Sequence, residues 1–273
     1  MSILKRRKPA RVSQNFPKSL RLVALTLIVA AFLYACERRS SSALKRIRSQ
    51  GTLRVAIDPT YPPFEFVNSS GIVVGFDVDL AQEIGKRLGV QTQFISTGYD
   101  ALYDALTVGR ADVIISALYP DPWQTSGFVF SPPYFNAGDV LVVPIDSPID
   151  EPTDLAGQHV SVVFGTEGHM EALRWERLLD PPPTVVPQES PDAVVAGLVS
   201  GAVEAGVVDN ISAQMALSQT PTLRTLAPPV TDEIYVIAGR DEDAALIEEI
   251  SKILQGMRED GTMEALIAHW MQG

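Results

Sequence analysis

Two polar side chains occupy matching places in the two halves of the chain. Gly109-Arg110-Ala111-Asp112 leads into an apolar run that ends at Ser116, and Gly201-Ala202-Val203-Glu204 leads into one that ends at Asp209. A hydroxyl and a carboxylate at the carboxyl ends of parallel strands lie where open α/β sheets bind their ligands. The two segments therefore predict a small polar ligand, held in a cleft between two facing lobes.

Patterns for other kinds of chemistry are missing from the sequence. It contains neither a P-loop nor a Gly-rich dinucleotide-binding turn, and no motif for a serine or cysteine nucleophile. Its histidines, His159, His169 and His269, are too scattered to bind one metal ion together. The single cysteine excludes an internal disulfide. We therefore expect a binding protein without cofactor or metal, and not an enzyme.

Hydrophobic periodicity predicts the elements that must position these side chains. The expected strands span residues 52–58, 91–96, 111–116, 135–144, 159–164, 202–209 and 233–239. The expected helices span residues 77–88, 100–108, 167–178, 190–199, about 242–259 and 260–271. Such alternation predicts an α/β fold, in which each lobe is a mostly parallel sheet flanked by helices.

Charge is divided unevenly along the chain. Its 273 residues include 22 Lys+Arg and 33 Asp+Glu, which gives a formal net charge of −11. The first 35 residues hold seven of the basic groups and no acid, so the remainder carries a net charge of −18. A body with so few basic groups cannot displace phosphate counterions, which excludes a nucleic-acid partner. The basic N-terminus is a separate functional unit.

This N-terminal unit has the features of a bacterial lipoprotein signal. Its basic stretch runs into residues 22–35, fourteen residues without a charge, whereas a membrane-spanning helix needs about 20. The segment ends in Leu33-Tyr34-Ala35-Cys36, which resembles a lipobox, where the cysteine is acylated and becomes the first mature residue. The only cysteine of the chain lies at that position, so we expect lipid on Cys36. A plain anchor helix with an incidental cysteine is the alternative.

Six stretches of the remaining chain resemble the extracytoplasmic solute-binding proteins of ABC importers, in the family 3 branch that binds amino acids and other small polar solutes. They are GTLRVAIDPTYPPFEF (51–66), GFDVDLAQEIGKRLG (75–89), GRADVIISAL (109–118), FSPPYFNAGDVLVV (130–143), DLAGQHVSVVFGT (154–166) and MREDGTMEALIAHW (257–270). The resemblance implies the two-lobed, periplasmic-binding-protein-like type II fold, with two hinge strands near residues 142–144 and 233–236.

The expected organisation follows from this resemblance. Residues 1–35 are a signal peptide, and residues 36–50 are the lipidated cysteine and a tether. The first lobe spans 51–142 and 234–273, and the second spans 143–233. The implied protein is extracytoplasmic, monomeric and anchored to the membrane through Cys36, with a small solute and a membrane permease as partners.

The resemblance also implies the ligand-binding positions of the first lobe. Tyr61 takes the place of an aromatic residue that covers the ligand, Asp58 ends the preceding strand, and Tyr99 is a second aromatic wall. Ser116, Ala117 and Tyr119 match residues that donate hydroxyl or backbone N–H bonds to a carboxylate. Packing for the tyrosines and helix capping for Ser116 are the alternative structural roles.

Two positions of the second lobe match ligand-binding residues in the same way. Thr166 matches a residue whose hydroxyl and N–H meet the ligand at a helix N-terminus, where anions are favoured. Asp209 matches the acid that pairs with the ligand's α-ammonium group, since a carboxylate after an apolar strand is costly to bury without a cationic partner. Capping of the following helix is the alternative for both.

One departure from the family pattern bears on the ligand. Members that bind α-amino acids have an arginine clamp for the carboxylate eight residues after the strand-end serine, and this chain has Gln124 there. Glutamine donates a hydrogen bond but does not neutralise charge. No Lys or Arg occurs from Ala111 to Leu173, while Glu167 replaces a small neutral residue. We therefore expect an amine-bearing ligand; a carboxylate held by neutral hydrogen bonds from Ser116, Ala117, Tyr119 and Gln124 is the alternative.

Three functions remain open at this point. The leading hypothesis is a lipid-tethered receptor that closes on a small solute and presents it to an importer. A sensor domain with a different signalling partner is the second. The third is a dehydratase of the same fold, in which Glu167 would be a general acid.

Overall fold

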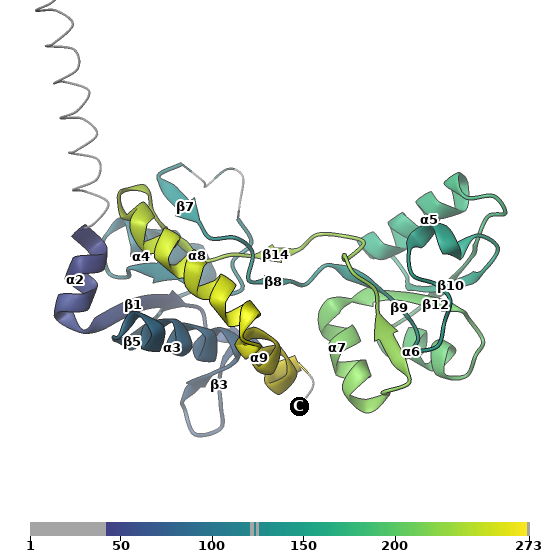
Figure 1. Cartoon of the computed structure of the whole chain (residues 1–273), viewed down its shortest axis with the longest axis horizontal. Coiled ribbons are helices and arrows are strands. Elements are labelled where there is room, and N and C mark those ends of the chain that lie inside the picture. The colour runs from purple at the N-terminus through teal and green to yellow at the C-terminus, as the bar shows by residue number, and fades with distance from the viewer. Residues whose placement is uncertain (1–41, 121–122, 124–125, 272–273) are drawn as a thin grey trace, which may run out of the picture.

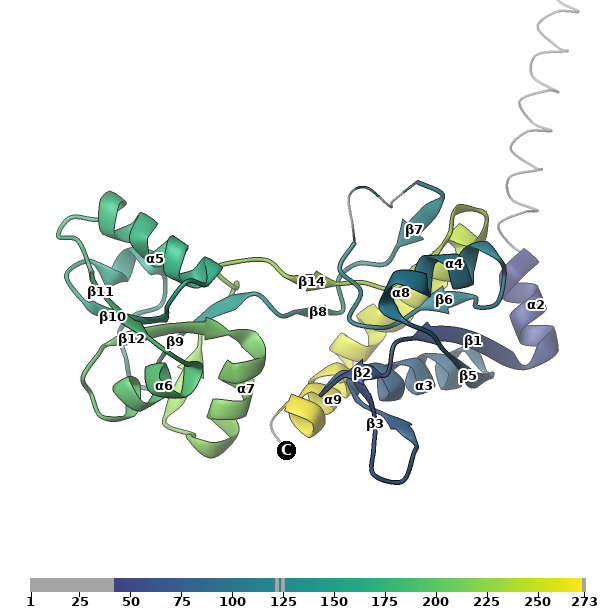
Figure 2. The same ribbon diagram turned by 180° about the vertical axis from the view of Figure 1, so that it is seen from behind.

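The computed structural model describes residues 42–120, 123 and 126–271. They form two lobes that lie side by side along the long axis and are connected by two extended segments (Figure 1). Figure 2 shows from behind that helices flank the sheet of each lobe. This arrangement confirms the two-lobed α/β architecture that the sequence predicts.

The first lobe is built from both ends of the chain. Its sheet has the strand order β5-β1-β6-β15-β7, in which only β15 runs against the other four. The strands are β1 (Thr52–Ile57), β5 (Gln91–Ser96), β6 (Val113–Ile114), β7 (Phe128–Phe130) and β15 (Ala238–Arg240). The helices are α2 (Ser42–Gln50), α3 (Phe76–Leu88), α4 (Leu102–Thr107), α8 (Ala244–Glu259) and α9 (Thr262–Met271), with 3-10 turns at Tyr99–Ala101 and Asp241–Asp243. A small sheet of β2 (Thr60–Tyr61), β3 (Glu65–Val67) and β4 (Val73–Val74) extends from it.

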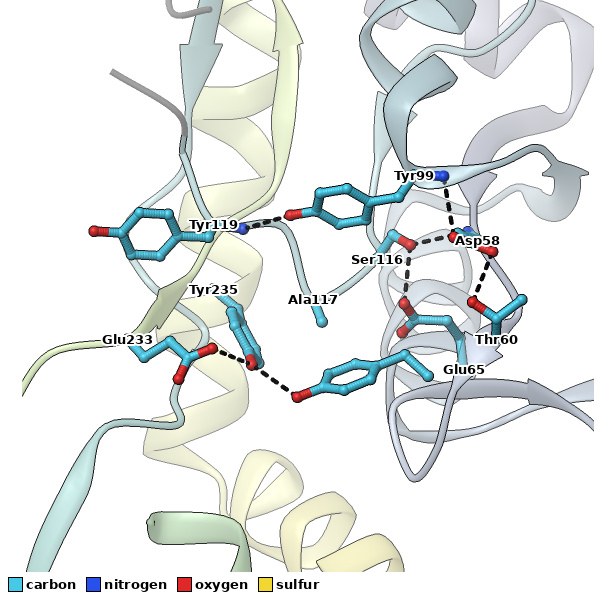
Figure 3. A pocket seen from close by; sticks show the side chains of 10 residues that line it. Asp58, Thr60, Glu65, Tyr99, Ser116, Ala117, Tyr119, Glu233 and Tyr235 are labelled. Carbon is cyan, nitrogen blue, oxygen red and sulfur yellow. Dashed lines mark hydrogen bonds between the residues drawn. The ribbon is translucent and has the colours of Figure 1, made fainter. Parts of the chain in front are cut away.

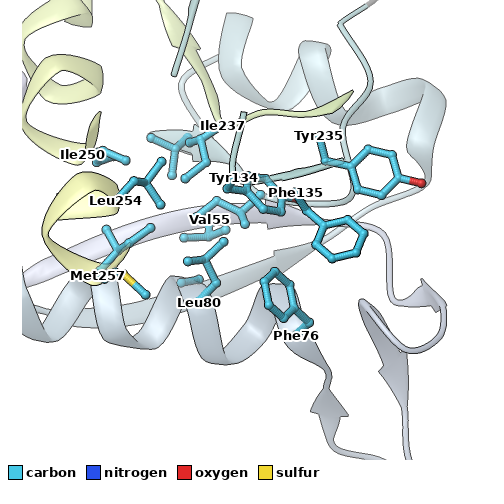
Figure 4. Packing of buried hydrophobic residues seen from close by; sticks show 14 of the residues in the cluster. Val55, Phe76, Leu80, Tyr134, Phe135, Tyr235, Ile237, Ile250, Leu254 and Met257 are labelled. Atoms are coloured by element: carbon cyan, nitrogen blue, oxygen red, sulfur yellow. The ribbon is translucent and has the colours of Figure 1, made fainter. Parts of the chain in front are cut away.

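Alternating side chains of the first sheet fill a core on each face. Val55 packs with Leu80 of α3 and Ile250 of α8 on one face (Figure 4), whereas its neighbour Ala56 packs with Leu106 of α4 on the other. Successive strand residues point to opposite faces, so a central strand buried on both sides must be apolar throughout. The apolar runs of the sequence predicted these central strands for that reason.

The second lobe repeats this plan. Its sheet has the order β11-β10-β12-β9-β13, and again only one strand, β9, runs against the other four. The strands are β9 (Asp139–Pro144), β10 (His159–Val163), β11 (Thr184–Gln188), β12 (Ala205–Asp209) and β13 (Leu223–Thr225). The helices are α5 (Glu167–Leu178), α6 (Pro191–Val199) and α7 (Asn210–Gln219), with a 3-10 turn at Pro152–Leu155. Ser190 caps α6 through the N–H of Ala193, as its sequence pattern predicts.

Two short strands connect the lobes. β8 (Phe135–Asn136) pairs antiparallel with β14 (Ile234–Tyr235), and this pair crosses between the lobes in both views (Figures 1 and 2). The side chain of Asn136 ties the crossing segments together, because its Oδ1 accepts from the N–H of Glu233 at 3.0 Å and its Nδ2 donates to Asp232 at 2.9 Å. A side chain at Gly138 would collide with the carbonyl of Thr231, so the two segments also approach closely there.

The first predicted hinge position is wrong by a few residues. Val142 and Val143 pair with β12 and β13 inside the second sheet, so they are part of that lobe rather than of the crossing. The predicted strand over 135–144 is in fact two strands, β8 and β9, interrupted at Ala137 and Gly138. A continuous apolar run does not reveal where a strand leaves one sheet and enters another. The second predicted hinge, at 233–236, agrees with β14.

Residues 42–50 form a packed helix rather than the predicted tether. Ile47 of α2 is fully buried in the first core, and Arg46 donates to the buried carboxylate of Asp112 at 2.6 Å. Arg54 of β1 binds the same carboxylate at 2.7 Å and lowers the pKa of Asp112, a shift that burial opposes. Residues 42–50 are therefore part of the first lobe. The predicted signal peptide and Cys36 lie outside the described residues, and no helix within the described part is long and apolar enough to cross a membrane.

Candidate ligand-binding site

A cavity of about 350 Å³ opens on the first lobe beside the crossing strands (Figure 3). It is lined by Asp58, Thr60, Tyr61, Glu65, Tyr99, Ser116, Ala117, Tyr119, Glu233 and Tyr235. Six of these are sequence-predicted ligand positions, which come together from the residue after β1, from β2, from the 3-10 turn before α4 and from the segment after β6. Its location at the carboxyl ends of β1 and β6 is the place expected for a ligand on an open α/β sheet.

Asp58 organises the backbone at the entrance of the cavity. It follows β1, and its two carboxylate oxygens accept from the hydroxyl of Thr60 at 3.1 Å and from the N–H of Tyr99 at 3.0 Å. These bonds fix the loop that carries Tyr61 relative to the turn that carries Tyr99.

Four tyrosines form the aromatic walls. Tyr61, Tyr99 and Tyr119 are each nearly half exposed, with 44%, 45% and 48% of their surface accessible. Tyr61 stacks on the buried ring of Phe64, with 5.6 Å between ring centroids. Flat aromatic faces at the rim of a cavity suit a ligand that carries a cation or an apolar body.

A chain of hydroxyls joins this wall to the crossing strand β14. The hydroxyl of Tyr235 donates to Glu233 at 3.0 Å and lies 3.4 Å from the hydroxyl of Tyr61. Burial and the Tyr61 hydroxyl raise the pKa of Tyr235, so it remains a donor to the Glu233 carboxylate. The crossing segment between the lobes therefore forms part of the cavity wall.

The donors predicted to hold a carboxylate are bonded inside the first lobe. The hydroxyl of Ser116 accepts from the N–H of Asp58 and donates to Oε1 of Glu65, both at 2.9 Å (Figure 3). The N–H of Ala117 donates to Asp77 at 2.5 Å. Tyr119 uses its N–H in a long bond of 3.4 Å to the hydroxyl of Tyr99. Ser116 is itself fully buried, so its side chain forms the floor of the cavity rather than a free donor.

The second lobe contributes its predicted residues from two helix N-termini. Thr166 caps α5, with its Oγ1 accepting from the N–H of His169 at 3.2 Å, and Glu167 is exposed in the first turn of that helix. Asp209 caps α7 by accepting from the N–H of Ser212 at 2.8 Å. Helix capping, the alternative role predicted for Thr166 and Asp209, is therefore present at both residues. None of these residues lines the cavity of the first lobe, from which the cleft separates them.

Asp139 adds an acid that the sequence analysis missed. It faces Asp209 in the pairing of β9 with β12, and its Oδ2 accepts from the N–H of Gly168 at 2.7 Å. Burial, together with the negative charges of Asp209 and Glu167, raises the pKa of Asp139. Three carboxylates therefore lie near one another at this edge of the second lobe.

No basic side chain balances these acids in the part of the cleft that the structure describes. The lining of the first-lobe cavity includes Asp58, Glu65 and Glu233 and neither Lys, Arg nor His. His169, beside the acids of the second lobe, accepts from the N–H of Gly165 through Nδ1. A charge that loses its contact with water is costly unless it is paired.

The structure also shows which lining residues the sequence failed to predict. They are Thr60, Glu65, Glu233 and Tyr235. Thr60 lies between two predicted positions, and its polarity after a strand end was an available signal. Glu65 is in a short hairpin strand and Glu233 is in the crossing, and no local pattern distinguishes either from a surface acid. The predicted Gln124 lies outside the described residues.

Comparisons with known proteins agree with the two-lobed fold. The chain is 33% identical over 224 residues to the histidine-binding periplasmic protein of Escherichia coli K12, covering 78% of this chain and 85% of that protein. It is 30% identical over 254 residues to the lysine/arginine/ornithine-binding periplasmic protein of the same organism, covering 90% and 94%. A solved ancestral cyclohexadienyl dehydratase has a TM-score of 0.71 at 22% identity, covering 84% of this chain and 96% of that chain. This last likeness shows the fold alone.

The family assignment rests on nearly the whole of the described chain. Residues 53–273 match the family described as bacterial extracellular solute-binding proteins, family 3. The matched region includes both lobes, both crossing strands and all ten residues that line the cavity. The chain therefore belongs to the bacterial extracellular solute-binding proteins of family 3.

Proposed function

We propose that this protein captures a small amine-bearing cation between its lobes and delivers it to an ABC importer. The observation that carries this proposal is the distribution of acids: Asp58 and Glu233 line the first-lobe cavity without a Lys, Arg or His, and Asp139, Asp209 and Glu167 lie together in the second lobe. A cation held over aromatic faces gains about 0.5–2 kcal/mol in addition to its ion pair. The tyrosine walls therefore add to the same preference.

Closure of the cleft brings the acids of the second lobe to the ligand. Asp209 pairs with the amine, and Glu167 or Asp58 is the second acid. Tyr61 and Tyr99 stack against the body of the ligand, and Thr166 contacts it from the start of α5. Sandwiching a ligand between two lobes is a common hinge mechanism for this kind of capture.

The ligand does not require a free α-carboxylate. Both relatives named above bind amino acids that carry a carboxylate as well as an amine. In this chain the hydroxyl of Ser116 and the N–H of Ala117 are bonded to buried acids, and Gln124 takes the place of the clamp arginine. These donors are therefore not free for a ligand carboxylate. An amine that lacks a carboxylate, such as agmatine or putrescine, fits this site best.

The charge pattern does not favour the dehydratase alternative. A cyclic carboxylate substrate would bring a negative charge into a cleft that already contains Asp58, Glu167 and Asp209. Glu167 is exposed at the start of α5, and we assign it to ligand contact rather than to acid catalysis. We therefore propose a binding protein that is lipid-anchored at Cys36 on the extracytoplasmic side, and that acts as a monomer.

A thermal-shift panel with matched charge classes tests this function. Compounds that bind only the folded protein raise its melting temperature, by an amount that grows with concentration over Kd. We expect agmatine, putrescine or L-arginine to raise it, and the dicarboxylate succinate and neutral glucose to leave it unchanged. A rise with succinate and none with any amine would overturn the proposal.

A further inference from the structure

Two buried carboxyl groups meet beneath the floor of the cavity. Glu65, from β3, is 1% exposed and Asp77, in the first turn of α3, is fully buried. Oε1 of Glu65 accepts from Ser116, and Oδ2 of Asp77 accepts from the N–H of Ala117 and from the hydroxyl of Tyr134 at 2.8 Å. The other oxygen of each group, Oε2 and Oδ1, has no hydrogen-bond partner of its own among the described residues.

One proton between these two oxygens would satisfy both. Within the described residues no Lys, Arg or His forms an ion pair with either group, so two charges would stand unbalanced in an apolar core. Two carboxyl groups that share such a site do not both ionise. The N-terminus of α3 favours negative charge on Asp77, which leaves the proton on Glu65.

We propose that Glu65 and Asp77 share one proton, and that this pair positions Ser116 and Ala117 so that the cavity floor offers a ligand no hydrogen-bond donor. The specificity part of this inference rests on the proposed function, because it explains why a carboxylate is not required. The proton itself is independent of any ligand. The shared proton is bound to Oε2 of Glu65, which donates it in a hydrogen bond to Oδ1 of the Asp77 carboxylate.

The direction of the Ser116 hydroxyl follows from this arrangement. Its oxygen accepts from the N–H of Asp58, so its single proton goes to Oε1 of Glu65, which has no proton of its own. The N–H of Ala117 is held by Asp77 in a left-handed backbone conformation, with φ of 39°. That conformation is strained for an alanine, and such strain persists only where surrounding contacts require it.

The neighbouring groups support a neutral Glu65. Burial, followed by the Asp77 carboxyl, raises its pKa far above the usual range, and the charge of Asp58 acts in the same direction. Burial also raises the pKa of Asp77, while its bonds from Ala117, Glu65 and Tyr134 lower it. The phenol of Tyr134 stays protonated, because burial and the two acids raise its pKa.

Folding must then take up one proton at pH values where a free glutamate is ionised. The folded protein holds the Glu65 proton and the unfolded chain does not, so stability falls as pH rises towards the raised pKa. Between pH 7 and 9 we expect the unfolding equilibrium constant of the full chain to rise about tenfold per pH unit more than that of Glu65→Gln. Glu189→Gln, an exposed acid of the second lobe, is the control and follows the unchanged chain. Parallel curves for Glu65→Gln and the unchanged chain would overturn the shared proton.

A double-mutant cycle tests the pairing directly. In Glu65→Gln the amide donates to Asp77 in place of the proton, and in Asp77→Asn the amide donates to Glu65. We expect each single variant to keep the fold. The double variant should lose more stability than the sum of the two single losses, because each amide oxygen still accepts from its own partners and the two NH2 groups then face each other. Additive losses would overturn the pair. Infrared spectra of the unchanged chain at pH 8 provide a check that needs no variant, since a protonated carboxylic acid band must be present and its absence also overturns the proposal.

Ser116→Ala tests the specificity part with two probes, L-arginine and agmatine. If the hydroxyl of Ser116 points towards Glu65, its loss loosens the backbone of Asp58. The affinity for both probes then falls by the same factor. If it reads a carboxylate, L-arginine alone loses affinity, by about threefold to tenfold for one neutral hydrogen bond, and the specificity part is wrong. This failure is distinguishable from that of the proposed function, in which neither amine binds the unchanged chain at all.

Discussion

At the residue scale, Asp209 caps a helix and is also the acid that we propose pairs with the ligand's amine. Its Oδ1 caps α7 through Ser212, and its charge stands opposite that of Asp139 across the β9–β12 pairing. A cap needs only an acceptor oxygen, whereas an ion pair needs the charge. The alternatives that the sequence left open for this position are therefore compatible, and a single substitution separates them.

Asp209→Asn keeps the cap and removes the charge. We expect it to fold normally and to weaken the binding of a cationic amine by about 2–5 kcal/mol, as when one member of a desolvated charge pair is lost. Calorimetric titration measures the change. Glu176→Gln is the matched control, because it removes an exposed acid from α5 of the same lobe. Equal affinity for Asp209→Asn and the control would remove Asp209 from the site.

Gln124→Arg restores the charge of the family's carboxylate clamp. We expect it to strengthen the binding of L-arginine relative to agmatine, because only L-arginine has a carboxylate for the new guanidinium. The same charge repels an amine in the cleft, so agmatine should bind more weakly than it does to the unchanged chain. Competition titration of the two ligands measures the ratio. A ratio that does not move, or that favours agmatine, would contradict the role of this position.

The family resemblance predicted much of the cavity lining but not its buried acid. It identified Asp58, Tyr61 and Tyr99 by their match to family positions, and the structure places them around one cavity. Glu65 was missed because its burial depends on the packing of a hairpin against α3, and no spacing in the sequence encodes that contact. Asp139 was missed for a similar reason, since its proximity to Asp209 arises from strand pairing across seventy residues.

At the scale of elements, the crossing strands β8 and β14 are where we expect the lobes to hinge. They are the two connections between the lobes within the described chain, and each is only two residues long. Short connections without a large interface leave relative motion of two lobes as the default. Tyr235 of β14 lines the cavity, so the same strand forms part of the cavity wall and part of the crossing between the lobes.

Small-angle scattering tests closure about these strands. We expect the radius of gyration to decrease when a saturating amine is added, because burying a ligand between the lobes requires them to approach. The same measurement on Asp209→Asn at an equal amine concentration is the control, since that variant should remain open. Profiles that coincide with and without saturating ligand would show that the cleft does not close on it.

Periodicity predicted most elements but not their junctions. The predicted ranges of β5 and α5 coincide with the structure, because one face of each is apolar and the flanking residues end the pattern. The predicted strand over 111–116 forms ladder pairs only at Val113 and Ile114, since the chain turns at the left-handed Ala117. Helix α2 was missed because its apolar contacts, Ala43 and Ile47, are too few to stand out in a polar segment.

At the scale of the whole molecule, the charge of the chain is divided between a basic N-terminus and an acidic remainder. Cys36, the proposed lipidation site, lies six residues before the start of α2 at Ser42. Cys36→Ser removes the proposed site of lipidation. Two acyl chains suffice for stable anchoring, so we expect this variant to be released from membranes or to remain unprocessed. Fractionation and mass spectrometry of the N-terminus measure both outcomes, and normal processing with unchanged membrane association would contradict the anchor.

The charge of the cleft leads to one direct measurement on the unchanged protein. Calorimetric titration with L-arginine and with agmatine compares two ligands that differ by a single carboxylate. An acidic cleft without a basic partner predicts that agmatine binds at least as tightly as L-arginine, because the lost carboxylate had no cation to pair with. Micromolar or tighter binding of L-arginine, together with no measurable binding of agmatine, would show that the site reads a carboxylate and would contradict the central claim.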